Sequence, residues 1–391
     1  NLPNQTDNLI ELIRDIYGSG FIPLHRPVFE GNERKYLVEC VDSNFVSSVG
    51  ENVKKLEQMT ANFTGTTHGV ATVNGTSALH MAMLVSGVIA GDEVISQALT
   101  FVATCNAITY CGASPVFIDV DRDTLGLSPN ALEKWLSQNA ELRDGQGFNK
   151  KTGARISACV PMHSFGFPLR IAEIVEICEA FGITVIEDTA ESLGSYVGDR
   201  HTGAFGELAT LSFNGNKVIT TGGGGMILTD NDELAKKAFH LTTTAKVPHP
   251  YEFVHDEVGY NYRLPNLNAA LGCAQMENLN AMLYIKADIA ENYRAFCLKH
   301  GFQFVNGIEN TRPNYWLNAI ILNSITERNA FLKYLNEQQV MSRPIWRLMN
   351  RLEMFKECQT DDLENSRCLE DRVVNIPSSV PEGMIENNHI S

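Results

Sequence analysis

The chain has 391 residues, of which 44% are hydrophobic and 20% charged, and its formal net charge is −15 at pH 7. This composition indicates a soluble globular protein of two domains, or of one large and one small domain. The negative charge argues against nucleic acid or an anionic membrane as the main partner. Nine cysteines without a C-x-x-C pair indicate neither a disulfide framework nor a zinc site, so we expect no metal and a reducing, cytoplasmic setting.

The first 50 residues contain no apolar run of membrane-spanning length, and neither does the rest of the chain. Apolar residues at positions 9, 10, 12, 13, 16 and 17 have the spacing of a helix rather than the continuous core of a signal peptide. We expect an extended segment at 21–28, a helix at 31–41, and a flexible segment at 45–50 that is able to approach a ligand.

A strand at 69–73, the turn Asn74-Gly-Thr-Ser77 and an apolar helix at 78–89 follow one another. The N–H groups and the dipole at such a helix N-terminus favour a phosphate, and the two hydroxyls add donors. Ser and Thr are also ordinary helix caps, so this turn alone leaves both interpretations open.

Strands and helices then alternate. We predict strands at 92–96, 113–120, 157–162 and 183–187, helices at 99–111, 128–138 and 170–181, and a polar surface loop at 138–156. This order predicts an α/β fold with a doubly covered, mostly parallel sheet, in which ligands bind at the carboxyl ends of the strands.

Two residues at predicted strand ends carry chemistry. Lys217 follows the apolar run at 208–212, and a lysine is able to form a Schiff base with a carbonyl, although it could equally be a solvated lysine beside the glycines at 222–225. Asp188 is either a helix cap or an acid facing a ligand. Pyridoxal phosphate needs a phosphate cradle, an amine and a carboxylate for its pyridine nitrogen, and this chain has one candidate for each.

Seven segments together carry a resemblance: Asn74-Gly-Thr-Ser-Ala78, Gly91-Asp-Glu-Val94, Thr100-Phe-Val-Ala-Thr104, Phe117-Ile-Asp-Val120, Glu187-Asp-Thr-Ala190, Ser212-Phe-Asn-Gly-Asn-Lys217 and Gly259-Tyr-Asn-Tyr-Arg-Leu264. The sequence resembles the DegT/DnrJ/EryC1/StrS family of pyridoxal-phosphate-dependent sugar aminotransferases over nearly its whole length. The resemblance implies the aspartate-aminotransferase-like fold (fold type I) and a homodimer with shared active sites.

The resemblance also implies a role for each matching residue. Lys217 would bind the cofactor as a Schiff base and carry the proton, and Asp188 would pair with the pyridine nitrogen. The phosphate would be held by four residues: Gly75, Thr76, Ser77 and Ser212.

Four further positions complete the implied site. Phe101 would stack on the cofactor ring, and Glu191 falls where relatives often carry His or Gln beside the cofactor's 3-hydroxyl. Asn261 would reach the phosphate of the neighbouring subunit, and Arg263 would help to bind substrate there.

The C-terminal third is less informative. We expect a long helical region from 265 to about 299, a strand at 318–323, a helix at 327–338 and an extended segment at 343–346. We divide the chain into a large cofactor-binding domain, 24–264, and a smaller α/β domain, 265–391, on which residues 1–23 would pack. Three residues are interpreted as buried aromatics and a surface arginine rather than substrate contacts: Trp316, Arg343 and Trp346. For His25 and His163 a structural and a functional interpretation both stay open.

The expected activity is transfer of an amino group from an amino acid, with glutamate as donor, to a nucleotide-linked 4-keto-6-deoxy sugar. Segments 23–27 and 46–50 resemble the branch that makes legionaminic-acid-type sugars, which implies a UDP-linked, N-acetylated acceptor. Arg263, with Arg26 or Lys35, is the candidate partner of the diphosphate. One alternative is a dehydratase of the same family, in which histidine replaces the lysine that is present here. Another is a non-catalytic protein that binds a small molecule.

Overall fold

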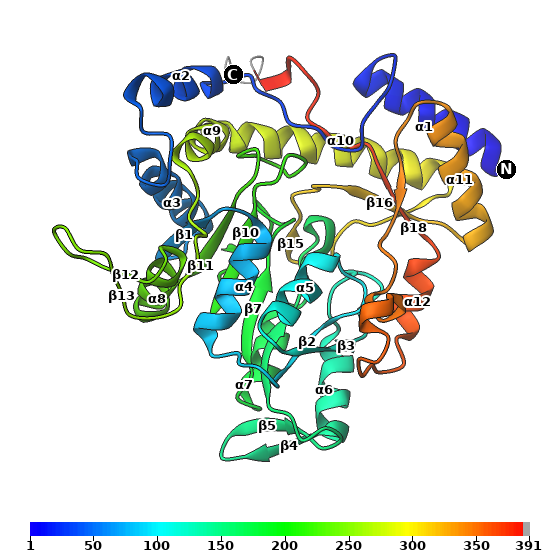
Figure 1. Cartoon of the computed structure of the whole chain (residues 1–391). Coiled ribbons are helices and arrows are strands. Elements are labelled where there is room, and N and C mark those ends of the chain that lie inside the picture. The colour runs from blue at the N-terminus through cyan, green and yellow to red at the C-terminus, as the bar shows by residue number, and fades with distance from the viewer. Residues whose placement is uncertain (386–391) are drawn as a thin grey trace.

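The computed structural model describes residues 1–385 and is built around a seven-stranded sheet (Figure 1). Its strands lie in the order β1-β11-β10-β7-β6-β2-β3. They are β1 (His68–Thr72), β2 (Glu93–Gln97), β3 (Ser114–Ile118), β6 (Ile156–Val160), β7 (Thr184–Asp188), β10 (Leu208–Ser212) and β11 (Gly225–Thr229). Only β11 runs antiparallel to its neighbours β1 and β10. The predicted mostly parallel sheet is confirmed.

Helices cover both faces of this sheet. They are α4 (Gly75–Ser86), α5 (Val102–Tyr110), α6 (Pro129–Asn139), α7 (Ile171–Glu179) and α8 (Asp232–Thr242). One apolar cluster joins side chains of α4, α5 and α8 to the sheet, and a second joins side chains of α6 and α7 to it. Strands covered on both faces are buried along their length, and every position of β2 and β11 is buried, including the polar residues Glu93, Ser96 and Gln97 of β2.

The C-terminal part has a second, smaller sheet in the order β14-β16-β18-β17. Its strands are β14 (Gln303–Phe304), β16 (Asn318–Ile321), β17 (Arg343–Pro344) and β18 (Val373–Ile376), with helices α10 (Leu279–His300), α11 (Ile325–Glu337) and α12 (Glu364–Glu370). The N-terminal helix α1 (Leu2–Tyr17) contacts α10 and α11 (Figure 1). One apolar cluster includes Leu9, Leu56 and Leu335, so the division at 264/265 stays a prediction. No helix within residues 1–385 combines the length and apolar character that crossing a membrane requires.

The remaining elements include a group of packed helices, a small sheet and a hairpin. Helices α2 (Glu33–Ser43) and α3 (Glu51–Thr64) pack on α9 (Asn266–Glu277), and β15 (Thr311–Arg312), β8 (Tyr196–Val197) and β9 (Arg200–His201) form a three-stranded sheet. Strands β12 (Lys246–Val247) and β13 (Val254–His255) form a hairpin that projects from the body beside α8 (Figure 1).

The expectation for the segment 138–156 was wrong. The segment 138–156 is not a plain loop but contains the hairpin of β4 (Ala140–Arg143) and β5 (Gln146–Asn149). Its two loop residues, Asp144 and Gly145, have φ values of 50° and 79°, which is the Asp-Gly turn that suits the twist of a hairpin. The expected helical region from 265 to about 299 is confirmed, because α9 and α10 occupy it and only Asn278, with φ of −106° and ψ of 3°, separates them.

Candidate active site

A cavity of about 760 Å³ lies at the carboxyl ends of the central strands. Because β7, β10 and β1 run in the same direction, the residues that follow them meet at one edge of the sheet. Seven of the predicted site residues line this cavity: Gly75, Thr76, Phe101, Asp188, Glu191, Ser212 and Lys217. Segments far apart in the sequence are thus brought together as the chain order predicts.

One wall of the cavity is the N-terminus of α4. The Asn74 side chain caps the helix by accepting the Ser77 N–H at 2.7 Å, which occupies that N–H. Gly75 and Thr76 are the first two helical residues, whose N–H groups have no acceptor within a helix. A Cβ on Gly75 would lie 3.0 Å from the Ser212 Cβ, so glycine lets the turn approach Ser212 closely. The result is an anion cradle of two chain segments.

Asp188, the last residue of β7, is 2% exposed. Its carboxylate accepts the Thr104 hydroxyl at 2.6 Å and the Ala190 N–H at 3.1 Å, so its orientation is fixed. Burial raises the pKa of Asp188, and the hydrogen bonds and the nearby Lys217 oppose this effect. A cation placed against Asp188 would stabilise its charged form.

Lys217 lies in the loop after β10, where its N–H donates to the Asn214 carbonyl at 3.1 Å. Its Nζ is 4.2 Å from the centre of the Trp316 ring, a cation–π contact. The indole Nε1–H donates to the Asn216 carbonyl at 2.7 Å, which fixes Trp316 against the same loop. The lysine is therefore held at the cavity wall by an aromatic side chain from the C-terminal part.

Glu191 also lies near this amine. Its Oε2 lies 3.8 Å from Lys217 Nζ, and its Oε1 accepts the Phe165 N–H at 2.8 Å. Burial raises the pKa of Glu191 to about 7, although the positive charge of Lys217 opposes the shift. The carboxyl group thus changes its charge near neutral pH, within reach of the cavity.

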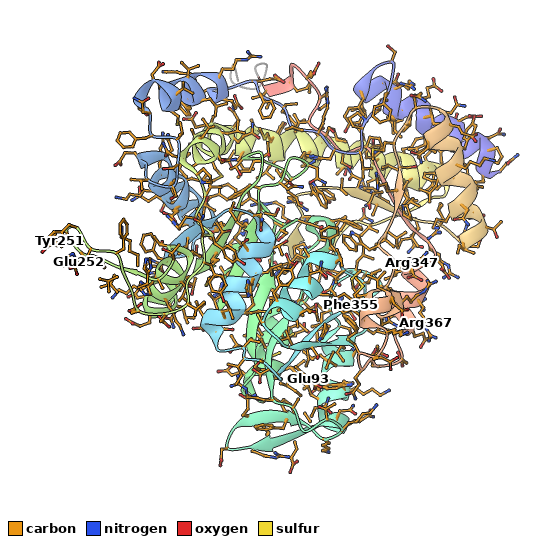
Figure 2. All side chains as sticks on the ribbon, viewed as in Figure 1. Glu93, Tyr251, Glu252, Arg347, Phe355 and Arg367 are labelled. Carbon is orange, nitrogen blue, oxygen red and sulfur yellow. The ribbon has the colours of Figure 1, made fainter. Side chains whose placement is uncertain are left out.

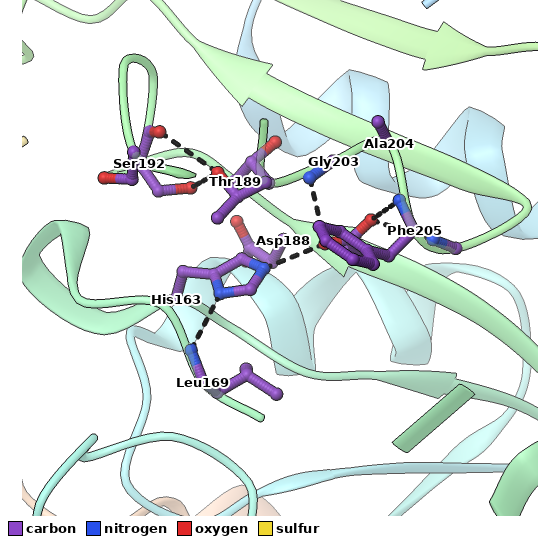
Figure 3. A network of polar contacts seen from close by, with 12 residues as sticks. His163, Leu169, Asp188, Thr189, Ser192, Gly203, Ala204 and Phe205 are labelled. Atoms are coloured by element: carbon purple, nitrogen blue, oxygen red, sulfur yellow. Dashed lines mark hydrogen bonds and ion pairs between the residues drawn. The ribbon is translucent and has the colours of Figure 1, made fainter. Parts of the chain in front are cut away.

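His163 belongs to a buried network below the site (Figure 3). Its Nδ1 accepts the Leu169 N–H at 3.1 Å, so its Nε2 carries the proton that it donates to Glu187 at 2.9 Å. Burial alone would raise the pKa of Glu187, but bonds from His163 and from the N–H groups of Gly206 and Gly203 lower it. His163 is thus structural, and it fixes the strand end that carries Asp188.

Three predicted site residues are not among the described residues that line the cavity. One of them, Ser77, lies in the α4 turn with its N–H bonded to Asn74. The other two lie elsewhere in the chain. Neither Asn261 nor Arg263 is among the described residues that line the cavity. Asn261 is exposed beside Thr243, and Arg263 donates to Glu57 and to the Ala71 carbonyl, both at 2.9 Å. Both were predicted to act in a neighbouring subunit, so their roles stay predictions.

Sequence reasoning placed too little weight on four residues. Trp316, Arg343 and Trp346 were interpreted as structural, and His25 was left open, yet all four line the cavity. The extended segment 343–346 was foreseen, but not its pairing through β17 with β18, which brings it to the site. That pairing depends on contacts between residues far apart in the chain, which no local pattern reveals.

Comparison with known proteins identifies this arrangement. The model of the DegT/DnrJ/EryC1/StrS aminotransferase family matches residues 27–384. The chain belongs to this family. This aminotransferase is 35% identical over 360 residues to the GDP-perosamine synthase of Vibrio cholerae, covering 91% of this chain and 94% of that protein.

Solved structures agree on the fold. The aminotransferase TlmJ from Streptoalloteichus hindustanus superposes with a TM-score of 0.83 at 23% identity, covering 94% of this chain and 96% of that one. Helicobacter pylori PseC, an aminotransferase in the biosynthesis of pseudoaminic acid, gives 0.83 at 19% identity, with coverage of 94% and 97%. The predicted family, fold class and aminotransferase activity are confirmed.

The family depends on pyridoxal phosphate, and the residues of this cavity fit that cofactor. The close approach of Gly75 to Ser212 leaves no room for a side chain and forms a cradle for a phosphate. Asp188 is a buried carboxylate suited to a cationic ring nitrogen, and Lys217 supplies an amine at the cavity wall. When bound, the pyridinium ring supplies an electron sink for charge that develops at the Cα of an amino acid.

Proposed function

We propose that this aminotransferase moves the amino group of glutamate to the keto carbon of a nucleoside-diphosphate 4-keto-6-deoxy sugar. One observation carries the proposal: Lys217 Nζ faces the same cavity as Asp188 and the cradle of Gly75 and Ser212. A cavity of about 760 Å³ lies in the range of small-molecule sites, roughly 300–1,000 Å³.

In this proposal each residue has one task. Thr76, Ser212 and the N–H groups of the α4 turn bind the phosphate, and Phe101 covers one ring face. Asp188 holds a proton on the pyridine nitrogen. Lys217 Nζ would take the Cα proton of the donor and deliver it to the cofactor carbon that bears the nitrogen. In the second half of the cycle it would move a proton in the opposite direction, from that carbon to the former keto carbon of the sugar.

The nucleotide of the sugar acceptor is the part of the proposal with the least support. The segments 23–27 and 46–50 resemble the branch that uses UDP-linked, N-acetylated sugars, whereas the Vibrio cholerae relative is named for a GDP-linked sugar. We retain the UDP-linked acceptor as our proposal and the GDP-linked one as its competitor. Arg263 with Arg26 or Lys35 was the predicted diphosphate site, but Arg26 pairs with Glu382 at 3.0 Å. Arg343, which lines the cavity, is a further candidate.

The active protein is proposed to be a homodimer in the cytoplasm. Tyr251 and Phe253 on the projecting hairpin are 82% and 84% exposed, and apolar surface of this kind is typical of an interface. Figure 2 places Tyr251 and Glu252 at the tip of this hairpin, away from the body of the subunit. Nine cysteines, all free, suit a reducing compartment.

The test offers the enzyme UDP- and GDP-linked 4-keto sugars, with and without an N-acetyl group, together with isotopically labelled glutamate. We expect the label in the amino group of the UDP-linked, N-acetylated product. If labelled product formed only from the GDP-linked sugar, the acceptor would be GDP-linked and not UDP-linked. Loss of water from the sugar without transfer of nitrogen would favour the dehydratase. Protein that stays colourless with added cofactor and gives no product would favour a binding protein.

A further inference from the structure

The half-buried His25 and the buried Lys286 form a pair at the edge of the cavity that neither the fold nor the predicted catalytic residues explain. Lys286, on α10, is 1% exposed, and its Nζ contacts three uncharged acceptors. They are His25 Nε2 at 2.9 Å, the Trp316 carbonyl at 3.2 Å and the Ser378 carbonyl at 2.5 Å. Burial lowers the pKa of Lys286 to about 7.

The contacts of Lys286 determine the tautomer of His25. Below its pKa of about 7, Lys286 is an ammonium with three protons. Because the two carbonyls only accept, Nζ then donates to both and has one proton left for His25 Nε2. Nε2 is then unprotonated, and a neutral imidazole carries its proton on Nδ1. His25 stays neutral because burial and the positive charges of Lys286 and Lys217 lower its pKa.

The Nδ1 atom of His25 has no hydrogen-bond partner within the described chain, although it is buried and the residue lines the cavity. The Asn216 carbonyl, which accepts the indole N–H of Trp316 at 2.7 Å, acts on the imidazole and raises its pKa, but it does not form a hydrogen bond with Nδ1. A buried donor without an acceptor is unfavourable, and a ligand oxygen that accepts from Nδ1 would remove this cost.

We propose that His25, held by Lys286, is a specificity-determining residue that donates from Nδ1 to an anionic oxygen of a substrate. Lys217 and Lys286 flank it in a protein of net charge −15, so this wall of the cavity favours negative charge. Two sources supply such an oxygen: the carboxylate of the amino donor and the diphosphate of the sugar nucleotide. The inference rests on the proposed function, which brings both to this cavity.

Two substitutions of His25 separate its two nitrogens. The amide of His25→Asn occupies the place of Nδ1 and retains the cavity-facing donor. The amide of His25→Gln extends toward Nε2 and retains the contact with Lys286 instead. If His25 had only a structural role, the two substitutions would affect ligand binding equally.

The probes are glutarate, which lacks an amine, and the nucleotides UDP and GDP, which lack a carbonyl, so none of them reacts. Calorimetry on the holoenzyme should show binding weakened about 10-fold or more in His25→Gln and within about 3-fold of wild type in His25→Asn. If His25→Gln weakens the binding of glutarate, the contact is with the carboxylate of the amino donor. If it weakens the binding of UDP or GDP, the contact is with the diphosphate.

Equal effects of both substitutions, no effect of either, or loss confined to cofactor affinity would overturn the proposal. If a His25 variant does not fold, Lys286→Met provides a second test, because it removes the group that fixes the tautomer and should weaken the same probe. Wild-type turnover tests the proposed function separately: His25-dependent glutarate binding without turnover would reject that function and leave this inference standing.

Discussion

Lys217 Nζ lies 3.8 Å from the Glu191 carboxylate and 4.2 Å from the centre of the Trp316 ring, so one amine is close to both an acid and an aromatic ring. The acid comes from the segment after β7 and the aromatic residue from the segment before β16. The closeness of Glu191 to Lys217 makes the charge of this site sensitive to pH near neutrality.

The first prediction concerns Glu191 in cofactor-free protein. Its folded pKa of about 7 exceeds its ordinary value of 4.5, so the folded state binds more protons between these values. The free energy of unfolding should therefore fall as pH rises through this window, by up to about 1.4 kcal/mol per pH unit relative to Glu191→Gln. Denaturant titrations from pH 4.5 to 8 measure the difference. A constant difference would show that Glu191 does not titrate there.

The second prediction concerns Asp188. Asp188→Asn should retain the fold and some cofactor but lose several orders of magnitude in turnover, since a neutral amide does not hold a proton on the pyridine nitrogen. Thr104→Val is the matched control, because it removes only the hydrogen bond to the carboxylate and should cost far less. Near-normal turnover in Asp188→Asn would make this acid only a helix cap.

The third prediction concerns Lys286. Its folded pKa of about 7 lies below its ordinary value of 10.5, so the unfolded chain binds more protons between these values. The stability of wild type relative to Lys286→Met should therefore rise with pH from 7 to 10, by up to about 1.4 kcal/mol per unit. This slope has the opposite sign to that of Glu191. If the difference in the free energy of unfolding between wild type and Lys286→Met did not change with pH, the pKa of Lys286 would be ordinary.

The fourth prediction concerns the subunit interface. Asn261→Asp would place a negative charge against the phosphate of the neighbouring subunit. Mixed dimers of Asn261→Asp and Lys217→Ala then contain one intact site and should recover activity that both parent dimers lack. Purification on two different tags verifies the mixed species. No recovery in such dimers would mean that one chain builds each site.

The sequence predicted the central sheet well because its signals are local. The buried strands are short runs with apolar residues at their centres, and Asp188 ends one of them while Lys217 lies in the loop after another. The hairpin at 140–149 was missed even though Asp144-Gly145 is a recognised turn signal, because its flanking residues are polar and were interpreted as a loop.

The part of the cavity lined by Trp316 and His25 was harder to predict. Trp316 reaches Lys217 from a segment about one hundred residues downstream, and the segment before His25 is positioned by the pairing of Ile22 with Val340. Such contacts are decided by packing between the two parts of the chain, and no short pattern encodes them. Lys286 gave no sequence signal either, since a lysine in a helix is ordinarily solvated.

Borohydride reduction of the cofactor-loaded enzyme, followed by peptide mapping, tests the central claim most directly, because it fixes the cofactor's carbonyl carbon to the amine that holds it. The account predicts a pyridoxyl group on Lys217 in wild type and in Lys286→Met alike, and none in Lys217→Ala. Lys286, the other lysine buried beside the cavity, is the most informative competitor. A pyridoxyl group on Lys286, or on any lysine other than Lys217, would contradict the account.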